Sequence, residues 1–91
     1  MEKTLILNGR SLSLTVLRVT DSEVDVSVDQ KQGTPLLATL RAVNPGYWGV
    51  LRINLHDAER VAPDSKSFCL LQTAIYDLAV GSAHHQRRKA A

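Results

Sequence analysis

One segment, residues 65–86, constrains the fold more than any other part of this 91-residue chain. It is the one stretch that is long enough and apolar enough, at helical spacing, to form a full helix closing a core. At 100° per residue its apolar side chains form one broad stripe, made of Phe68, Leu71, Ala74, Ile75, Leu78 and Ala79. We therefore expect a C-terminal helix, capped by residues 63–65, whose stripe is buried against a sheet.

The same helix carries a second apolar stripe, displaced by about a third of a turn from the first. It consists of Cys69, Tyr76 and Val80. A helix that covers one face of a small sheet needs only one buried stripe, so the second requires a separate explanation. Either neighbouring loops or a short helix cover it, or a partner does, such as a second copy of the chain. The second interpretation makes these three residues the candidate partner-binding site.

The sequence before this helix predicts an antiparallel sheet. Asn8 and Gly9 both favour positive φ and form the strongest short hairpin signal, so we expect strands over residues 3–8 and 11–20 to pair. The alternation of apolar and polar residues changes phase within the second strand. That change predicts a bulge, or the end of pairing, near Leu17.

Two further strands are expected downstream. Residues 24–29 alternate three valines with polar side chains, and residues 47–56 are predicted to form another strand. Between them, residues 34–43 fit either a helix or a strand. Thr34 and Pro35 make a favourable helix start, although the leucines and alanines that follow also alternate. We favour a short helix at 35–43.

These elements predict an α+β fold, in which an antiparallel sheet of about four strands carries the C-terminal helix on one face. The chain is long enough for one small hydrophobic core and too short for a second. We expect a single globular domain over residues 1–86. Residues 87–91 are expected to form a basic, disordered tail.

The formal charge of +2 is concentrated at the end of the chain. Arg87, Arg88 and Lys89 supply three positive charges, and residues 1–86 carry eight basic and nine acidic side chains. This distribution argues against a basic nucleic-acid surface on the folded body. The tail itself can still contact phosphates in a salt-dependent manner.

A row of side chains on the strand predicted over 47–56 also bears on whether the chain binds nucleic acid. Simple alternation places an aromatic ring and several hydrogen-bonding groups on its outward face, namely Trp48, Arg52, Asn54 and His56. An ordinary solvated face, with the tryptophan packed at the edge of the core, explains the pattern equally simply, and we favour it. A nucleic-acid-binding accessory protein that uses this face and the basic tail is our alternative function.

The sequence lacks the patterns that enzymes and metal sites require. Its five glycines are scattered, so no glycine-rich phosphate loop is present, and no nucleophile elbow occurs. Cys69 lies among apolar residues, where a thiol is unreactive. No zinc or calcium spacing is found among His56, Asp57, Glu59, His84 and His85. We therefore expect no catalysis, no cofactor and no metal.

What remains is a small non-catalytic protein-binding module that acts as a regulator, adaptor or inhibitor and can self-associate. Its expected partner is another protein or a second copy of itself. We expect a cytoplasmic location, because the single cysteine forms no internal disulfide and the apolar runs are too short to span a bilayer. The first residues also lack the pattern of a signal peptide.

Overall fold

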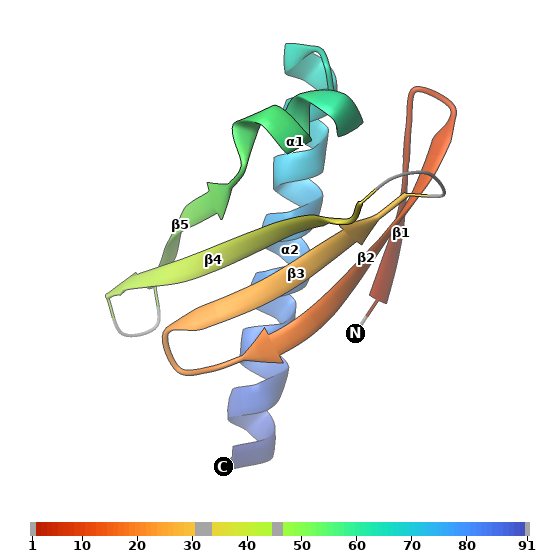
Figure 1. Cartoon of the computed structure of the whole chain (residues 1–91). Helices are drawn as coiled ribbons and strands as arrows, with labels where there is room; N and C mark the ends of the chain where they lie inside the picture. Colours follow the sequence, from red (N-terminus) through yellow and green to blue (C-terminus); the bar gives the residue numbers. More distant parts are fainter. Residues whose placement is uncertain (1, 31–33, 45–46, 91) are drawn as a thin grey trace.

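The computed structural model describes residues 2–30, 34–44 and 47–90, with side chains through His84. Five antiparallel strands form one sheet in the order β1-β2-β3-β4-β5, and two helices follow it. Figure 1 shows α2 crossing one face of the sheet and extending past it at its C-terminal end. The elements are β1 (Glu2–Leu7), β2 (Arg10–Val19), β3 (Glu23–Asp29), β4 (Leu36–Asn44), β5 (Tyr47–Ile53), α1 (Leu55–Val61) and α2 (Ser65–Ala90).

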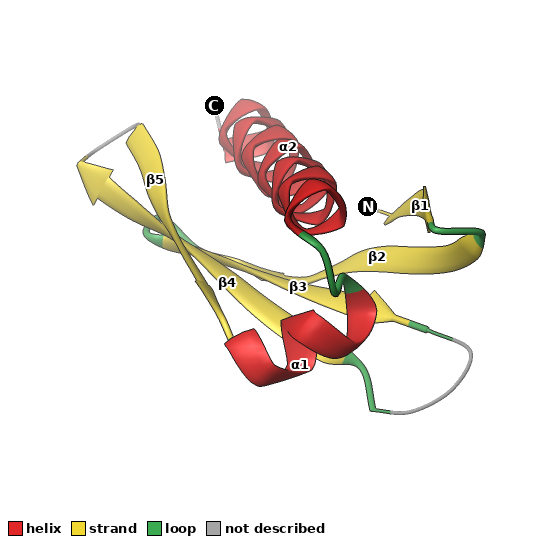
Figure 2. Ribbon diagram, turned by 90° about the horizontal axis from the view of Figure 1, so that it is seen from above, coloured by secondary structure: helices red, strands yellow, loops and turns green. Residues whose placement is uncertain are grey.

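The sheet is curled around α2. An antiparallel sheet with the C-terminal helix on one face is the predicted α+β fold, and this prediction is confirmed. Figure 2 shows the edge strands β1 and β5 on either side of α2, with α1 at one end of the sheet. The core lies between the sheet and α2, because alternate residues of each strand face the helix. Its largest fully buried side chains are Leu12, Leu14, Val24, Val26, Val28, Leu36, Leu40, Leu71 and Ile75. We call the face of the sheet turned away from α2 the outer face.

The start of α2 is fixed by its own cap and by the first hairpin. The carboxylate of Asp64 accepts hydrogen bonds from the Ser67 backbone N–H at 2.8 Å and from the Ser67 hydroxyl at 2.9 Å. These bonds satisfy donors that the first turn of a helix leaves free. The Asn8 side-chain amide donates to the Ser67 hydroxyl at 2.9 Å, so the β1–β2 turn is tied to the helix start.

The first hairpin and its bulge were correctly predicted. Asn8 and Gly9 have φ values of 50° and 78°, as a tight hairpin turn requires. Further along the hairpin, Val16 pairs with Val26 and Arg18 pairs with Asp25. The residue left between these two pairs, Leu17, therefore forms the bulge.

The helix expected at 35–43 is wrong, because this segment is strand β4. It pairs with β3 on one side and β5 on the other, which gives the sheet five strands rather than about four. Its alternate residues Leu36, Ala38 and Leu40 are buried in the core. Pairing on both sides and this burial outweigh the local helix-start preference of Thr34 and Pro35.

The second helix lies later in the chain, at α1. The Asn54 side-chain oxygen accepts hydrogen bonds from the backbone N–H groups of His56 and Asp57, at 3.0 and 3.2 Å. Asn54 is thus the N-cap of α1, and the strand predicted to reach residue 56 ends at Ile53.

At the other end of the chain, the backbone of α2 continues past residue 86 to Ala90. The domain boundary at 86 and the disordered tail stay predictions. Within the described part of the chain, no helix has the length and apolar content needed to cross a membrane.

Candidate protein-binding surface

One residue of the second apolar stripe, Tyr76, lies where α2 passes beside the edge strand β5. Cys69 is exposed, Tyr76 is 39% exposed, and Val80 is partly buried against the core. We use the name α2–β5 surface for these three residues together with Leu51, Gln72 and Thr73. Tyr76, with its neighbours Gln72 and Thr73, therefore forms the helix side of a junction with an edge strand.

Tyr76 holds this junction together. Its hydroxyl donates a hydrogen bond of 2.6 Å to the backbone carbonyl of Trp48 in β5. The ring leaves part of its surface open, while its polar end is satisfied. This combination is common for tyrosines at interfaces, since the side chain offers apolar area at a small cost in conformational entropy.

A shallow hollow lies between the helix and the strand. It has a volume of about 300 Å³ and is lined by Leu51 of β5 and by Gln72, Thr73 and Tyr76 of α2. An aliphatic and an aromatic side chain supply apolar walls, and an amide and a hydroxyl supply polar groups. A hollow of this kind suits one apolar side chain of a protein partner better than a charged ligand.

The strand beside this hollow is an edge of the sheet. β5 pairs with β4, and no described segment pairs with its other side. Its exposed residues include Tyr47 and Val50, which are 63% and 42% exposed. Arg52 is the one charged residue among its seven. Backbone groups and apolar side chains are thus available at the same edge.

The nucleic-acid face proposed from the sequence is not assembled. Trp48 is only 5% exposed and belongs to the core, as the favoured interpretation expected, so it does not share an outward face with Arg52 as the alternative required. The physical reason is a bulge: Ala42 pairs with Trp48 and Arg41 with Val50, which leaves Gly49 as an extra residue. The bulge reverses the alternation of β5, so the tryptophan and Arg52 point to opposite faces.

The other members of that set are also dispersed. Asn54 uses its side chain to cap α1, and His56 lies in the first turn of that helix. The side chains of Arg87, Arg88 and Lys89 lie outside the described residues. Among the described residues, no group of three or more acidic, histidine or cysteine side chains is placed to hold a metal ion.

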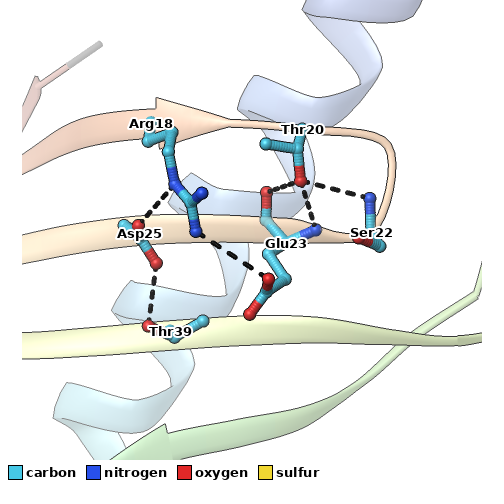
Figure 3. Close-up of polar contacts among 6 residues, drawn as sticks. All are labelled: Arg18, Thr20, Ser22, Glu23, Asp25 and Thr39. Carbon is cyan, nitrogen blue, oxygen red and sulfur yellow. Dashed lines mark hydrogen bonds and ion pairs between the residues drawn. The ribbon is translucent and has the colours of Figure 1, made fainter.

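Three charged residues of the outer face, Arg18, Glu23 and Asp25, form an internal network (Figure 3). Arg18 Nε donates to Asp25 Oδ2 at 2.8 Å, and the Thr39 hydroxyl donates to Asp25 Oδ1 at 2.8 Å. The hydrogen bond from Thr39, with further help from Arg18, lowers the pKa of the Asp25 carboxyl against the opposing effect of burial. Arg18 also lies 3.8 Å from Glu23. Strands β2, β3 and β4 are therefore joined by hydrogen bonds and ion pairs between their side chains.

Three residues of the α2–β5 surface, Leu51, Gln72 and Thr73, lie outside the partner-binding set predicted from the sequence. Gln72 lies three residues after Cys69, a spacing that places both on the same flank of a helix and was a usable signal. Leu51 was expected on the buried face of its strand. Its position beside Tyr76 depends on which strand forms the edge, and local sequence does not contain that information.

Comparisons with models of protein families, with curated proteins and with solved structures found no match for this chain.

Proposed function

We propose that this chain is a small non-catalytic protein-binding module, a regulator, adaptor or inhibitor, that binds its partner through the α2–β5 surface. As part of this proposal we place it in the cytoplasm, since its single cysteine leaves no internal disulfide.

One observation carries the proposal: the apolar hollow between Leu51 and Tyr76 adjoins a strand edge with no described neighbour. The hollow offers a place for an apolar anchor residue, and the edge offers backbone hydrogen bonds. The two features lie on the same side of the molecule, so a single partner segment can use both.

The experiment compares two arginine substitutions at exposed positions. Thr73→Arg fills the mouth of the hollow with a charged side chain, whereas Leu37→Arg adds the same charge on the outer face, at a residue that is 63% exposed. Both variants should keep the circular dichroism of the parent chain. Each is then purified under native conditions from cells that express it, with and without nuclease treatment.

A protein partner that survives nuclease, is retained by Leu37→Arg and is lost with Thr73→Arg is the expected result. A bound species that disappears with nuclease would instead support the nucleic-acid alternative. Equal recovery of a partner by both variants would place its binding site elsewhere on the chain.

A further inference from the structure

The two edges of the sheet are protected to different degrees. Edge strands expose backbone groups that can pair with another chain, and native proteins often block them with charged residues. β1 carries Glu2 and Lys3 among its six residues. β5 has no lysine and no acidic residue, and six of its seven residues are uncharged. The edge most open to strand pairing therefore lies next to the hollow of the α2–β5 surface.

We propose that a second copy of this chain binds here, with the two β5 strands paired antiparallel about a twofold axis at Leu51. The proposal rests on the proposed function and names its partner. The paired strands join the two sheets into one continuous sheet. A twofold arrangement brings the same surface of both copies together, so the interface closes as a dimer and leaves no β5 edge free.

The register follows from which way the side chains face. Directly opposite residues of an antiparallel pair lie on the same face of a sheet. Leu51 and Ile53 pack toward the core, whereas Val50 and Arg52 do not. A twofold at Val50 would set Arg52 against the buried Trp48 of the other copy and mix the two faces. A twofold at Arg52 keeps the faces but sets two guanidinium groups opposite each other, which is unfavourable.

A twofold at Leu51 sets each face of one strand against the same face of the other and places no two like charges opposite each other. It pairs Leu51 with its own copy on the helix side, next to the hollow lined by Thr73 and Tyr76. On the outer face it pairs Val50 with Arg52 of the second copy. The arginine then extends over an aliphatic side chain, and its charged end remains in solvent.

The first test uses charge at position 50, because the register places it against Arg52 of the other copy. Sedimentation velocity of the full chain over a concentration series should show a monomer–dimer equilibrium. Val50→Lys should weaken the dimer at least about tenfold, since it creates a like-charge pair. Val50→Glu should leave the dimer as strong or stronger. Ile6→Lys, at a residue 71% exposed on the other edge strand, is the control and should have no effect.

The second test measures the register directly in a Cys69→Ser background. Opposite residues in an antiparallel ladder have Cα atoms about 4.5–5.5 Å apart, within the range that a disulfide spans. Leu51→Cys should therefore form a disulfide-linked dimer on mild oxidation, and Ile6→Cys should not.

A chain that stays monomeric throughout the series, or equal effects of lysine and glutamate at position 50, would overturn the self-pairing. The protein-binding proposal fails by a different result, namely that Thr73→Arg changes neither the dimer nor the recovery of a separate protein partner. A monomer whose separate protein partner is lost with Thr73→Arg refutes only the self-pairing.

Discussion

The substitution Leu71→Ala tests quantitatively whether the buried stripe of α2 packs against the sheet. Leu71 is fully buried, with 0% of its surface exposed, whereas its neighbour Leu70 is 49% exposed. Both residues lie in the same turn of the same helix, and both substitutions improve helix propensity slightly. The difference between them therefore reports burial against the sheet.

The expected magnitude follows from the side-chain atoms removed. Leu→Ala removes three carbon groups, and at about 0.8 kcal/mol each their transfer to water costs about 2.4 kcal/mol. The cavity left in the core raises the expected loss to about 3–5 kcal/mol. A 91-residue domain is stable by about 5–14 kcal/mol, so Leu71→Ala should remove a large fraction of the stability.

Guanidinium chloride unfolding, followed by circular dichroism, measures both variants against the parent chain. We expect Leu70→Ala to change the free energy of unfolding by less than about 0.5 kcal/mol. A loss at Leu71 below about 0.5 kcal/mol, or equal losses at the two positions, would show that α2 presents a different face to the sheet.

Three further predictions concern other parts of the chain. Tyr76→Phe removes the hydroxyl that donates to the Trp48 carbonyl and should lower the free energy of unfolding by about 0.5–1.5 kcal/mol in the same assay. The pKa of Asp64 is lowered, chiefly by the backbone hydrogen bond from Ser67, so its contribution to stability should be present above the unfolded pKa of about 3.9 and be lost as pH falls through the folded value. In Asp64→Ala the free energy of unfolding should therefore fall less steeply as the pH is lowered than it does in the parent chain. An equally steep fall in both proteins would contradict the role of Asp64 as the helix cap. Deletion of residues 87–91 should leave thermal unfolding unchanged, because Ala83 is the last buried residue described.

The sequence allowed correct predictions where the controlling interactions are local. The turn at Asn8 and Gly9 follows from the backbone preferences of two residues. The bulge at Leu17 is marked by a phase change that four or five residues suffice to detect. The buried stripe of α2 follows from helical periodicity alone.

The errors arose where distant pairing decides the structure. Residues 36–44 form a strand because β3 and β5 both pair with them, and nothing within the segment indicates those neighbours. In β5 the signal was present but was overlooked. Trp48 and Leu51 are three residues apart and both pack toward the core, a spacing that breaks strict alternation and marks the bulge at Gly49. Applying the reasoning used for Leu17 would have predicted this bulge and supported the favoured placement of the tryptophan at the core.

The candidate surface was only partly predictable for the same reason. The helical contribution of Cys69, Tyr76 and Val80 follows from the spacing of one segment. The contribution of β5 depends on the strand order, which makes it an edge. Long-range order of this kind is set by the whole sheet, so the hollow and the open edge became visible only in the structure.

Hydrogen exchange of β5 reports on the proposed pairing of two β5 strands without any substitution, because it measures the backbone amides of the interface itself. Amides on a free strand edge exchange quickly, and pairing with another strand protects them. Exchange is measured by mass spectrometry on the full chain at a low and a high protein concentration. If two β5 strands pair, Tyr47–Ile53 should exchange more slowly at high concentration, while Glu2–Leu7 should be unchanged. Equal rates for Tyr47–Ile53 at both concentrations would contradict this pairing.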